Sequence, residues 1–458
     1  MATTPYEYYE ENQQQHLEGL INLLKIPSIS TLPEHKPDIR RAVEFLANEL
    51  RDMGMKNVEI IEGKEGQHPL LYAEWLEAHG KPTLVVYGHY DVQPADPLDE
   101  WHSPPFEPTV RNDNIYARGA VDDKGQTYLL VKALEGFLRT QGRLPLNIKV
   151  LFEGEEEVGG EHIDEYVAAH ADRLKADAAL VCDTEMFAPE LPTITTGLRG
   201  LVYTELTARA AAHDLHSGVY GGAAANPFQA LAEMVVNLKG PDGKIRIPGF
   251  YKRVKKPTAK ELASWKRLPF NEKNFLKKEI GGTALVGEKG HSVLERLWAR
   301  PTLEVHGIRG GFTGEGAKTV IPAVATAKIS MRLVPEMNPK EVIRQYSAYV
   351  KKITPKGITT SVRLLSSAPA SVVSTESRWI AAASEAMEQV FKKKTVFMRS
   401  GGSIPIVGQF QKYLKIPSVM MGFGLPDDNL HAPNEKFHLP NFYRGIHAVG
   451  RYFELLGQ

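Results

Sequence analysis

The stretch TLVVYGHYDVQP, residues 83–94, constrains the fold of this chain more than any other. Residues 84–87 form an apolar run typical of a strand buried on both faces of a parallel sheet. The run ends at Gly88 and is followed by His89 and Asp91. Because ligands of open α/β sheets bind outside the carboxyl ends of the strands, these two side chains lie where chemistry usually occurs. Asp91 can hold one ring nitrogen of His89 and leave the other free for a metal ion.

Strand-like and helix-like segments alternate around this stretch. Amphipathic helices are predicted over 126–139 and 161–171, and buried strands over 146–152 and 178–181. The pattern changes after residue 197 and resumes near residue 371. The predicted fold class is therefore α/β, with a mostly parallel sheet flanked by helices and an inserted α+β domain. We expect the first domain to comprise residues 1–197 and 371–458, and the insertion to comprise residues 198–370.

Composition excludes several classes of protein. The 458 residues include 55 Lys and Arg and 55 Asp and Glu, so no net field favours nucleic acid or an anionic membrane. The single cysteine, Cys182, excludes an intramolecular disulfide and an all-cysteine zinc site. No apolar run is long enough to span a membrane, and the acidic N-terminus has no signal-peptide pattern. We therefore expect a cytoplasmic protein that binds neither nucleic acid nor membranes.

Two local patterns have ordinary explanations. The segment 244–279 carries twelve Lys or Arg against three Glu. It contains no recognised nucleic-acid-binding motif, so a solvated face is favoured over nucleic-acid binding, which stays an alternative. The segment GGFTGEGAKT, residues 310–319, resembles a phosphate loop, but Ala317 separates Gly316 from Lys318. We reject nucleotide binding there.

Potential metal ligands follow the predicted strands one after another. They are His89, Asp122, the acids at 155–157, Asp183 and, in a late loop, His431. Each taken singly has an ordinary reading, as a helix cap or a solvated charge. Together, two histidines and three carboxylates suit two divalent ions of the zinc, manganese or cobalt type. One carboxylate must then bridge the ions, and one must stay off them as a base.

With these motifs in place, the chain resembles the M20 family of dinuclear metallopeptidases, in its cytosolic nonspecific dipeptidase and carnosinase branch. The resemblance covers nearly the whole chain. The motifs occur in family order: LLKIPSIS, GHYDVQP, ARGAVDDKG, EGEEEVGG, LHSGVYGG, GAKTVIP, MRLVP, GGSIP and HAPNEK.

The resemblance implies a role for each site residue. One metal ion would be held by His89 and Asp183, the other by Glu157 and His431, with Asp122 bridging them. Glu156 would be the general base, and Asp91 would orient His89. The implied reaction is hydrolysis of the peptide bond of dipeptides or short peptides by a water held between the ions. Zinc is the favoured ion, with manganese or cobalt as alternatives.

The resemblance also assigns the insertion as a lid and dimerisation domain. His216 would reach into the partner subunit's site of a homodimer and stabilise the oxyanion. Thr319 and Arg332 would hold the carboxylate of the small peptide substrate, and Ser403 would contact the substrate from the first domain.

Two positions depart from the branch. Dipeptidases of this type commonly have Glu before GGS, where this chain has Ser400, and the segment SSAPAS (366–371) lacks a histidine of some animal carnosinases. Both departures argue against carnosine-like specificity, and neither affects the metal ligands. Ser400 favours an alternative, an N-acyl or N-carbamoyl amino acid amidohydrolase with the same site. A non-catalytic binding protein on this fold would predict a broken ligand set, and none of the ligand positions is broken.

Overall fold

The structure is a computed structural model that describes residues 3–458. The chain forms two compact units, which are described separately. The first unit comprises residues 1–196, 373–398 and 404–458, and the second comprises residues 197–372 and 399–403. The short segment 399–403 thus belongs to the second unit, although the chain on both sides of it belongs to the first.

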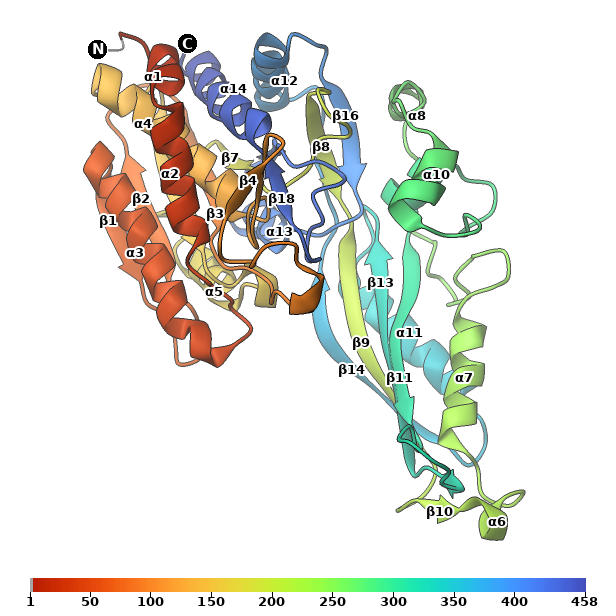
Figure 1. Ribbon diagram of the computed structural model, residues 1–458. Helices are drawn as coiled ribbons and strands as arrows, with labels where there is room; N and C mark the ends of the chain where they lie inside the picture. The colour runs from red at the N-terminus through yellow and green to blue at the C-terminus, as the bar shows by residue number, and fades with distance from the viewer. Residues whose placement is uncertain (1–2) are drawn as a thin grey trace. The chain divides into compact units, whose positions relative to one another are not determined.

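The first unit is built on a mixed sheet with the strand order β1-β2-β6-β3-β7-β17-β8-β15, and β16 also pairs with β8 (Figure 1). The strands are β1 (Lys56–Ile61), β2 (Leu70–Trp75), β3 (Thr83–His89), β6 (Asn147–Glu153), β7 (Ala178–Val181), β8 (Thr193–Leu198), β15 (Ser371–Val372), β16 (Val396–Ser400) and β17 (Ser418–Met420). The neighbours β6, β3, β7 and β17 are parallel, whereas β1 and β2, and β2 and β6, are antiparallel. The predicted α/β class is confirmed, but the sheet is mixed because the short link from β1 to β2 permits only antiparallel pairing.

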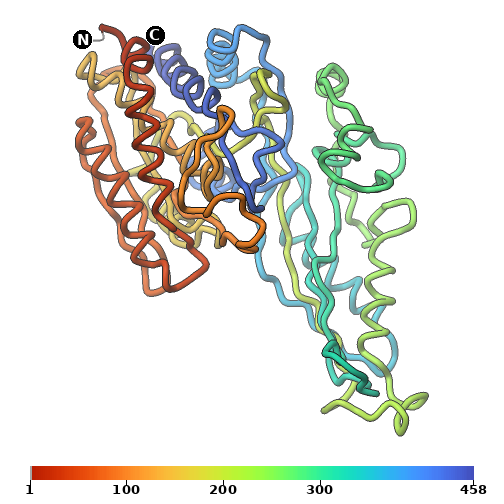
Figure 2. Tube along the Cα trace, in the orientation of Figure 1, coloured from red at the N-terminus to blue at the C-terminus, as the bar shows by residue number. Residues whose placement is uncertain are grey.

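Helices cover this sheet and enclose the core. They are α1 (Pro5–Glu11), α2 (Gln13–Leu24), α3 (Lys36–Met53), α4 (Lys124–Gln141), α5 (Glu161–Ala169), α12 (Arg378–Phe391), α13 (Pro405–Gln409) and α14 (Leu439–Gly457). Helix α3 ends at Gly54, whose φ of 103° only glycine adopts readily. The first and last helices, α1 and α14, lie side by side (Figure 2). A small sheet of β4 (Thr109–Arg111), β5 (Asn114–Tyr116) and β18 (Lys436–His438) joins an early segment to a late one.

The second unit is an antiparallel sheet in the order β11-β13-β9-β14 with helices packed on one face. Its strands are β9 (Gly200–Arg209), β11 (Thr302–Gly310), β13 (Val324–Leu333) and β14 (Thr359–Ala368), with a separate pair β10 (Leu215–His216) and β12 (Val320–Ile321). Its helices are α6 (Ser217–Tyr220), α7 (Pro227–Leu238), α8 (Ala259–Trp265), α9 (Glu272–Asn274), α10 (Val293–Trp298) and α11 (Pro339–Ile353), with a π-helical turn at Phe275–Ile280. Buried and half-buried residues alternate along β9, as expected of a sheet with one apolar face.

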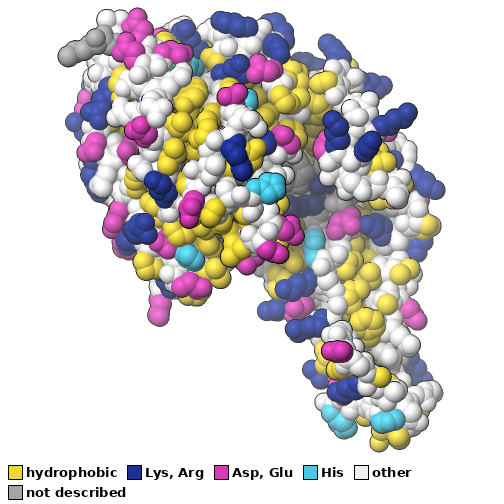
Figure 3. All heavy atoms as spheres, viewed as in Figure 1, with side chains coloured by type: hydrophobic (Ala, Val, Ile, Leu, Met, Phe, Trp, Pro, Cys, Tyr) yellow, Lys and Arg dark blue, Asp and Glu magenta, His cyan; other side chains and the backbone are white. Residues whose placement is uncertain are grey.

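Surface charge agrees with the balanced composition. On the face of the first unit drawn in Figure 3, basic and acidic side chains are interspersed. Within residues 3–458, no helix combines the length and apolar character that crossing a membrane requires.

Candidate metal centre

The predicted ligands sit at the carboxyl ends of four adjacent parallel strands. His89 is the last residue of β3, and Glu157 lies in a short 3₁₀ turn after β6. Asp183 follows β7, and His431 lies in the loop after β17. Asp122 comes from the loop that leads into α4. Because parallel strands end at the same edge of a sheet, residues more than 300 positions apart in the chain are brought together.

The five side chains form two groups that share Asp122. His89, Asp122 and Asp183 make one group, and Asp122, Glu157 and His431 make the other, with all ligand atoms in a group within 4.8 Å of one another. Asp122 Oδ1 lies 3.2 Å from His89 Nε2, and Asp122 Oδ2 lies 2.9 Å from His431 Nε2. Each oxygen of one carboxylate therefore faces a different histidine, which is the arrangement required of a bridging ligand.

Asp91 lies where it can orient the centre. His89 Nδ1 is 3.1 Å from the backbone carbonyl oxygen of Asp91 and 3.4 Å from its carboxylate. A carbonyl only accepts hydrogen bonds, so Nδ1 donates to it, and Nε2 is the ring nitrogen that faces the other ligand candidates. The Asp91 carboxylate accepts hydrogen bonds from the backbone N–H groups of Glu156 and Glu157, at 3.2 and 3.1 Å. Asp91 thus ties the β3 end to the turn that carries both glutamates.

Crowding of acids dominates the electrostatics. Burial raises the pKa of Asp183 well above its usual value, and Asp123 and Asp122 raise it further. Burial also raises the pKa of Glu156, and the neighbouring charges of Asp183 and Glu157 raise it further. The pKa of Glu157 is raised to about 7 by burial and by Asp122. Carboxyl groups placed so closely either take up protons or bind cations.

The residues present fit a pair of divalent ions. Glu157 Oε1 is buried and has no hydrogen-bond partner among residues 3–458, an uncommon state for a carboxylate oxygen. Imidazole nitrogens and carboxylate oxygens are the donors that zinc, manganese and cobalt accept. His431 has a φ of 61°, a left-handed conformation that is uncommon for residues with a Cβ, as often found at functional sites.

Three supporting residues were not singled out by the sequence. The buried carboxylate of Glu435 accepts hydrogen bonds from Arg118 and from the backbone N–H groups of residues 119, 121 and 122. Asp123 accepts from the backbone N–H of His89, and Gln93 Nε2 donates to Glu157 Oε2 at 2.7 Å. Glu435 lies inside the quoted motif HAPNEK, but sequence cannot distinguish a buried acid there from an exposed one.

The four predicted substrate residues fall into two pairs within the second unit. His216 pairs with Val320 between β10 and β12, and the next backbone N–H, of Ser217, donates to the carbonyl oxygen of Thr319 at 3.1 Å. Both His216 and Thr319 are exposed. At the other end of β13, Arg332 Nη1 donates to Ser403 Oγ at 2.9 Å. The sequence grouped Thr319 with Arg332, whereas the structure places it beside His216.

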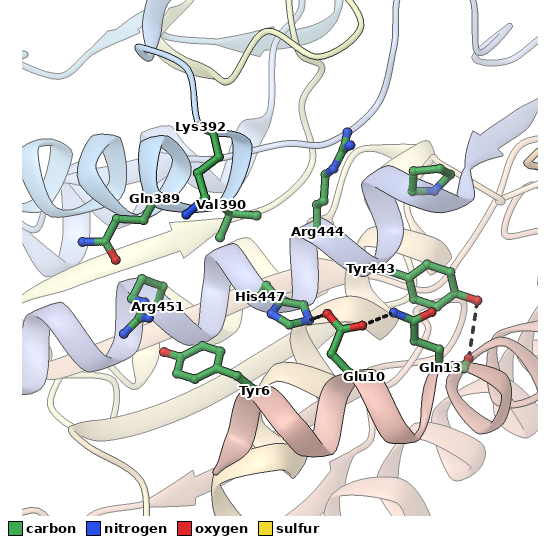
Figure 4. A pocket seen from close by; sticks show the side chains of 11 residues that line it. Tyr6, Glu10, Gln13, Gln389, Val390, Lys392, Tyr443, Arg444, His447 and Arg451 are labelled. Atoms are coloured by element: carbon green, nitrogen blue, oxygen red, sulfur yellow. Dashed lines mark hydrogen bonds and ion pairs between the residues drawn. The ribbon is translucent and has the colours of Figure 1, made fainter.

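A hollow of the first unit lies apart from these residues. It has a volume of about 800 Å³ and lies between α1, α2, α12 and α14 (Figure 4). Most of its charged side chains are paired: Glu10 with His447, Arg444 with Glu190, and Arg451 with Glu454. None of the predicted site residues lines it, so we assign the chemistry to the strand ends, where the donor groups converge.

Comparison with known proteins settles the family. The model of peptidase family M20/M25/M40 matches residues 85–455, a span that includes every metal-ligand candidate. The chain belongs to this family. The resemblance seen in the sequence is thereby confirmed.

Relatives within the M20 family align over almost the full chain. The Cys-Gly metallodipeptidase dug1 of Schizosaccharomyces pombe is 32% identical, covering 98% of this chain and 96% of that protein. Human carnosine dipeptidase 1 has a similar structure, with a TM-score of 0.87 and 28% identity over 99% of this chain and 98% of that one. The M20 metallo-carboxypeptidase Sso-CP2 of Sulfolobus solfataricus also gives a TM-score of 0.87, at 32% identity over 96% of this chain and 99% of that one. The predicted class, an M20 metallopeptidase with dipeptidase relatives, is confirmed.

Proposed function

We propose that this chain is a hydrolase that cleaves the peptide bond of dipeptides or short peptides with the help of two divalent metal ions. One observation carries the proposal: Asp122 lies between two groups of ligands, with one oxygen toward His89 and the other toward His431. His89 and Asp183 would hold one ion, and Glu157 and His431 the other. We favour zinc over manganese and cobalt, because zinc binds more tightly to a given set of nitrogen and oxygen donors.

The ions, when bound, would lower the pKa of a coordinated water and polarise the substrate carbonyl group. Glu156 would act as general base, taking the proton of the attacking water and passing it to the leaving amine. Its raised pKa, caused first by burial, suits a group that must hold a proton during the reaction. Asp91 would fix His89 and the turn that carries Glu156 relative to each other, through the hydrogen bonds described above.

We further propose that the second unit completes the site as part of a homodimer. His216 pairs with Val320, before β13 begins, and Arg332 lies eight residues beyond Val324 along that strand. At ~3.3 Å per residue, Val324 and Arg332 lie about 26 Å apart along β13, whereas a dipeptide spans only about 7 Å. This spacing supports a site in which His216 and Arg332 come from different copies. A partner's His216 would therefore donate to the oxyanion while Arg332 and Ser403 bind the substrate carboxylate.

A second candidate function is hydrolysis of N-acyl or N-carbamoyl amino acids. It is favoured by Ser400, a neutral residue whose hydroxyl accepts a hydrogen bond from the Gly402 N–H at 3.1 Å. No acid occurs in the segment 399–403 that would attract a free substrate amino group. The resemblance to a metallo-carboxypeptidase is consistent with this reading.

Metal analysis of the purified protein, combined with a substrate panel, tests these proposals. We expect two ions per chain, loss of activity with a chelator, and recovery when metal is restored. Free dipeptides, their N-acetyl derivatives and N-carbamoyl amino acids should be compared at equal concentration. Hydrolysis of free dipeptides alone supports the dipeptidase; hydrolysis of blocked substrates alone supports the second candidate. Activity that is indifferent to chelator would overturn both. A cytoplasmic location stays a prediction from the sequence.

A further inference from the structure

Arg199 bonds the segment 399–403 through its backbone and its side chain. The Arg199 backbone N–H donates to the carbonyl oxygen of Gly402 at 3.1 Å, and its side-chain Nε donates to the carbonyl oxygen of Gly401 at 3.1 Å. The Ser403 hydroxyl in turn donates to the Arg199 carbonyl oxygen at 2.5 Å. Arg199 immediately precedes β9, so a rigid strand of the sheet holds the segment that carries Ser403.

A second guanidinium reaches the same place. Arg332 Nη1 donates to Ser403 Oγ, the hydroxyl that donates to Arg199. Thr302 lies opposite Arg332 in the pairing of β11 with β13, and its hydroxyl is 3.5 Å from Arg199 Nη1. Arg199 and Arg332 therefore share two neighbours, Ser403 and Thr302, and lie next to each other on the second unit.

Neither guanidinium has a carboxylate partner within the described residues. Arg399, in the same segment, shows the ordinary arrangement, because it is paired with Glu261. Burial and the neighbouring Arg332 charge together lower the pKa of Arg199 to about 10, and the charge of Glu304 opposes this shift. Burial also lowers the pKa of Arg332. Two half-buried like charges without a salt-bridge partner favour a bound anion.

We propose that Arg199 and Arg332 together form a subsite for a dianionic C-terminal residue, so that the enzyme prefers peptides ending in Asp or Glu. This inference rests on the proposed function. Arg332 and Ser403 hold the α-carboxylate, as proposed above. Arg199 donates hydrogen bonds to protein groups from Nε and Nη1. Its Nη2 is then left to donate to the side-chain carboxylate of the substrate. Two cations then meet two anionic groups, which a peptide ending in a neutral residue cannot supply.

The test compares Ala-Asp with Ala-Asn, two dipeptides of nearly equal shape that differ by one charge. For the metal-loaded wild-type protein we expect kcat/KM to favour Ala-Asp by roughly tenfold to a hundredfold, the range of hydrogen bonds to charged groups. Arg199→Gln should abolish this preference, mainly through KM for Ala-Asp. Arg199→Lys should keep part of it. Arg253→Gln is the control, because Arg253 is a surface residue paired with Glu341.

Equal losses on both substrates in Arg199→Gln would overturn the inference, since they would show that Arg199 only fastens the segment. Calorimetric titration with L-aspartate and L-asparagine separates this inference from the hydrolase proposal. A protein that hydrolyses no peptide but binds aspartate more tightly, through Arg199, would refute the hydrolase and support the subsite. Hydrolysis of both dipeptides without any preference for aspartate would support the hydrolase and refute the subsite.

Discussion

The two units differ in how they assemble functional side chains. In the first unit, the five predicted metal ligands converge near the ends of neighbouring parallel strands, and His89 is fully buried. In the second, the four predicted substrate residues form two pairs toward opposite ends of β13, and His216 is exposed. The convergence in the first unit lies within one chain, whereas the proposed substrate site also requires a residue of a second copy.

The largest effect should follow from Glu156→Gln, which removes the base and keeps the shape of the metal centre. We expect kcat to fall by roughly 10²–10⁴-fold. Metal content measured by mass spectrometry should stay at the wild-type level. Glu161→Gln, an exposed acid at the start of α5, serves as the control and should change neither quantity. Full activity in Glu156→Gln would remove the base from the mechanism.

Mixed dimers test directly whether His216 acts on the partner's site. Homodimers of Glu156→Gln and of His216→Ala should each be nearly inactive. If His216 stabilises the oxyanion, His216→Ala should lower kcat by roughly 10²–10³-fold. A heterodimer isolated with two different tags contains one intact site if His216 acts on its partner, so about half of the wild-type activity should return. No recovery in a verified heterodimer would contradict action across the interface.

Gln93→Ala tests how far the metal centre is pre-organised. Gln93 Nε2 donates to the Glu157 carboxylate, and loss of such a supporting contact typically costs ~10–100-fold in metal affinity. Competition with a chromogenic chelator measures the affinity. The matched control is Gln389→Ala, whose amide bonds Glu385 on the distant helix α12. Unchanged affinity in Gln93→Ala would show that the strands alone position Glu157.

The smallest effect concerns pH. The pKa of Glu157 is raised to about 7, so protons compete with metal for this carboxylate below that pH. Apparent metal affinity should fall by up to about tenfold per pH unit below pH 7, and binding should release protons. Calorimetric titration of the protein with metal, in buffers of different ionisation enthalpy, measures the number of protons released. Affinity that is constant from pH 8 to pH 5 would contradict the raised pKa.

Much of the fold was predictable because burial leaves a clear periodic pattern. The predicted strand at 178–181 coincides with β7, and the predicted helix at 126–139 lies within α4. The exposed edge strand β14 was not predicted, because its half-exposed pattern lacks a continuous apolar run. Glu435 was not predicted either, because its role depends on backbone groups more than 300 residues earlier in the chain.

The sequence by itself determined the donor groups: histidines and acids in a fixed order, each following a segment apolar enough to be a buried strand. Side-chain chemistry and hydrophobic periodicity are local properties, and they can be read without coordinates. Tertiary structure decided which donors meet, that Asp122 faces both histidines, and that Thr319 accompanies His216 rather than Arg332. Those relations arise from strand order and register, which long-range pairing sets and no short stretch of sequence contains.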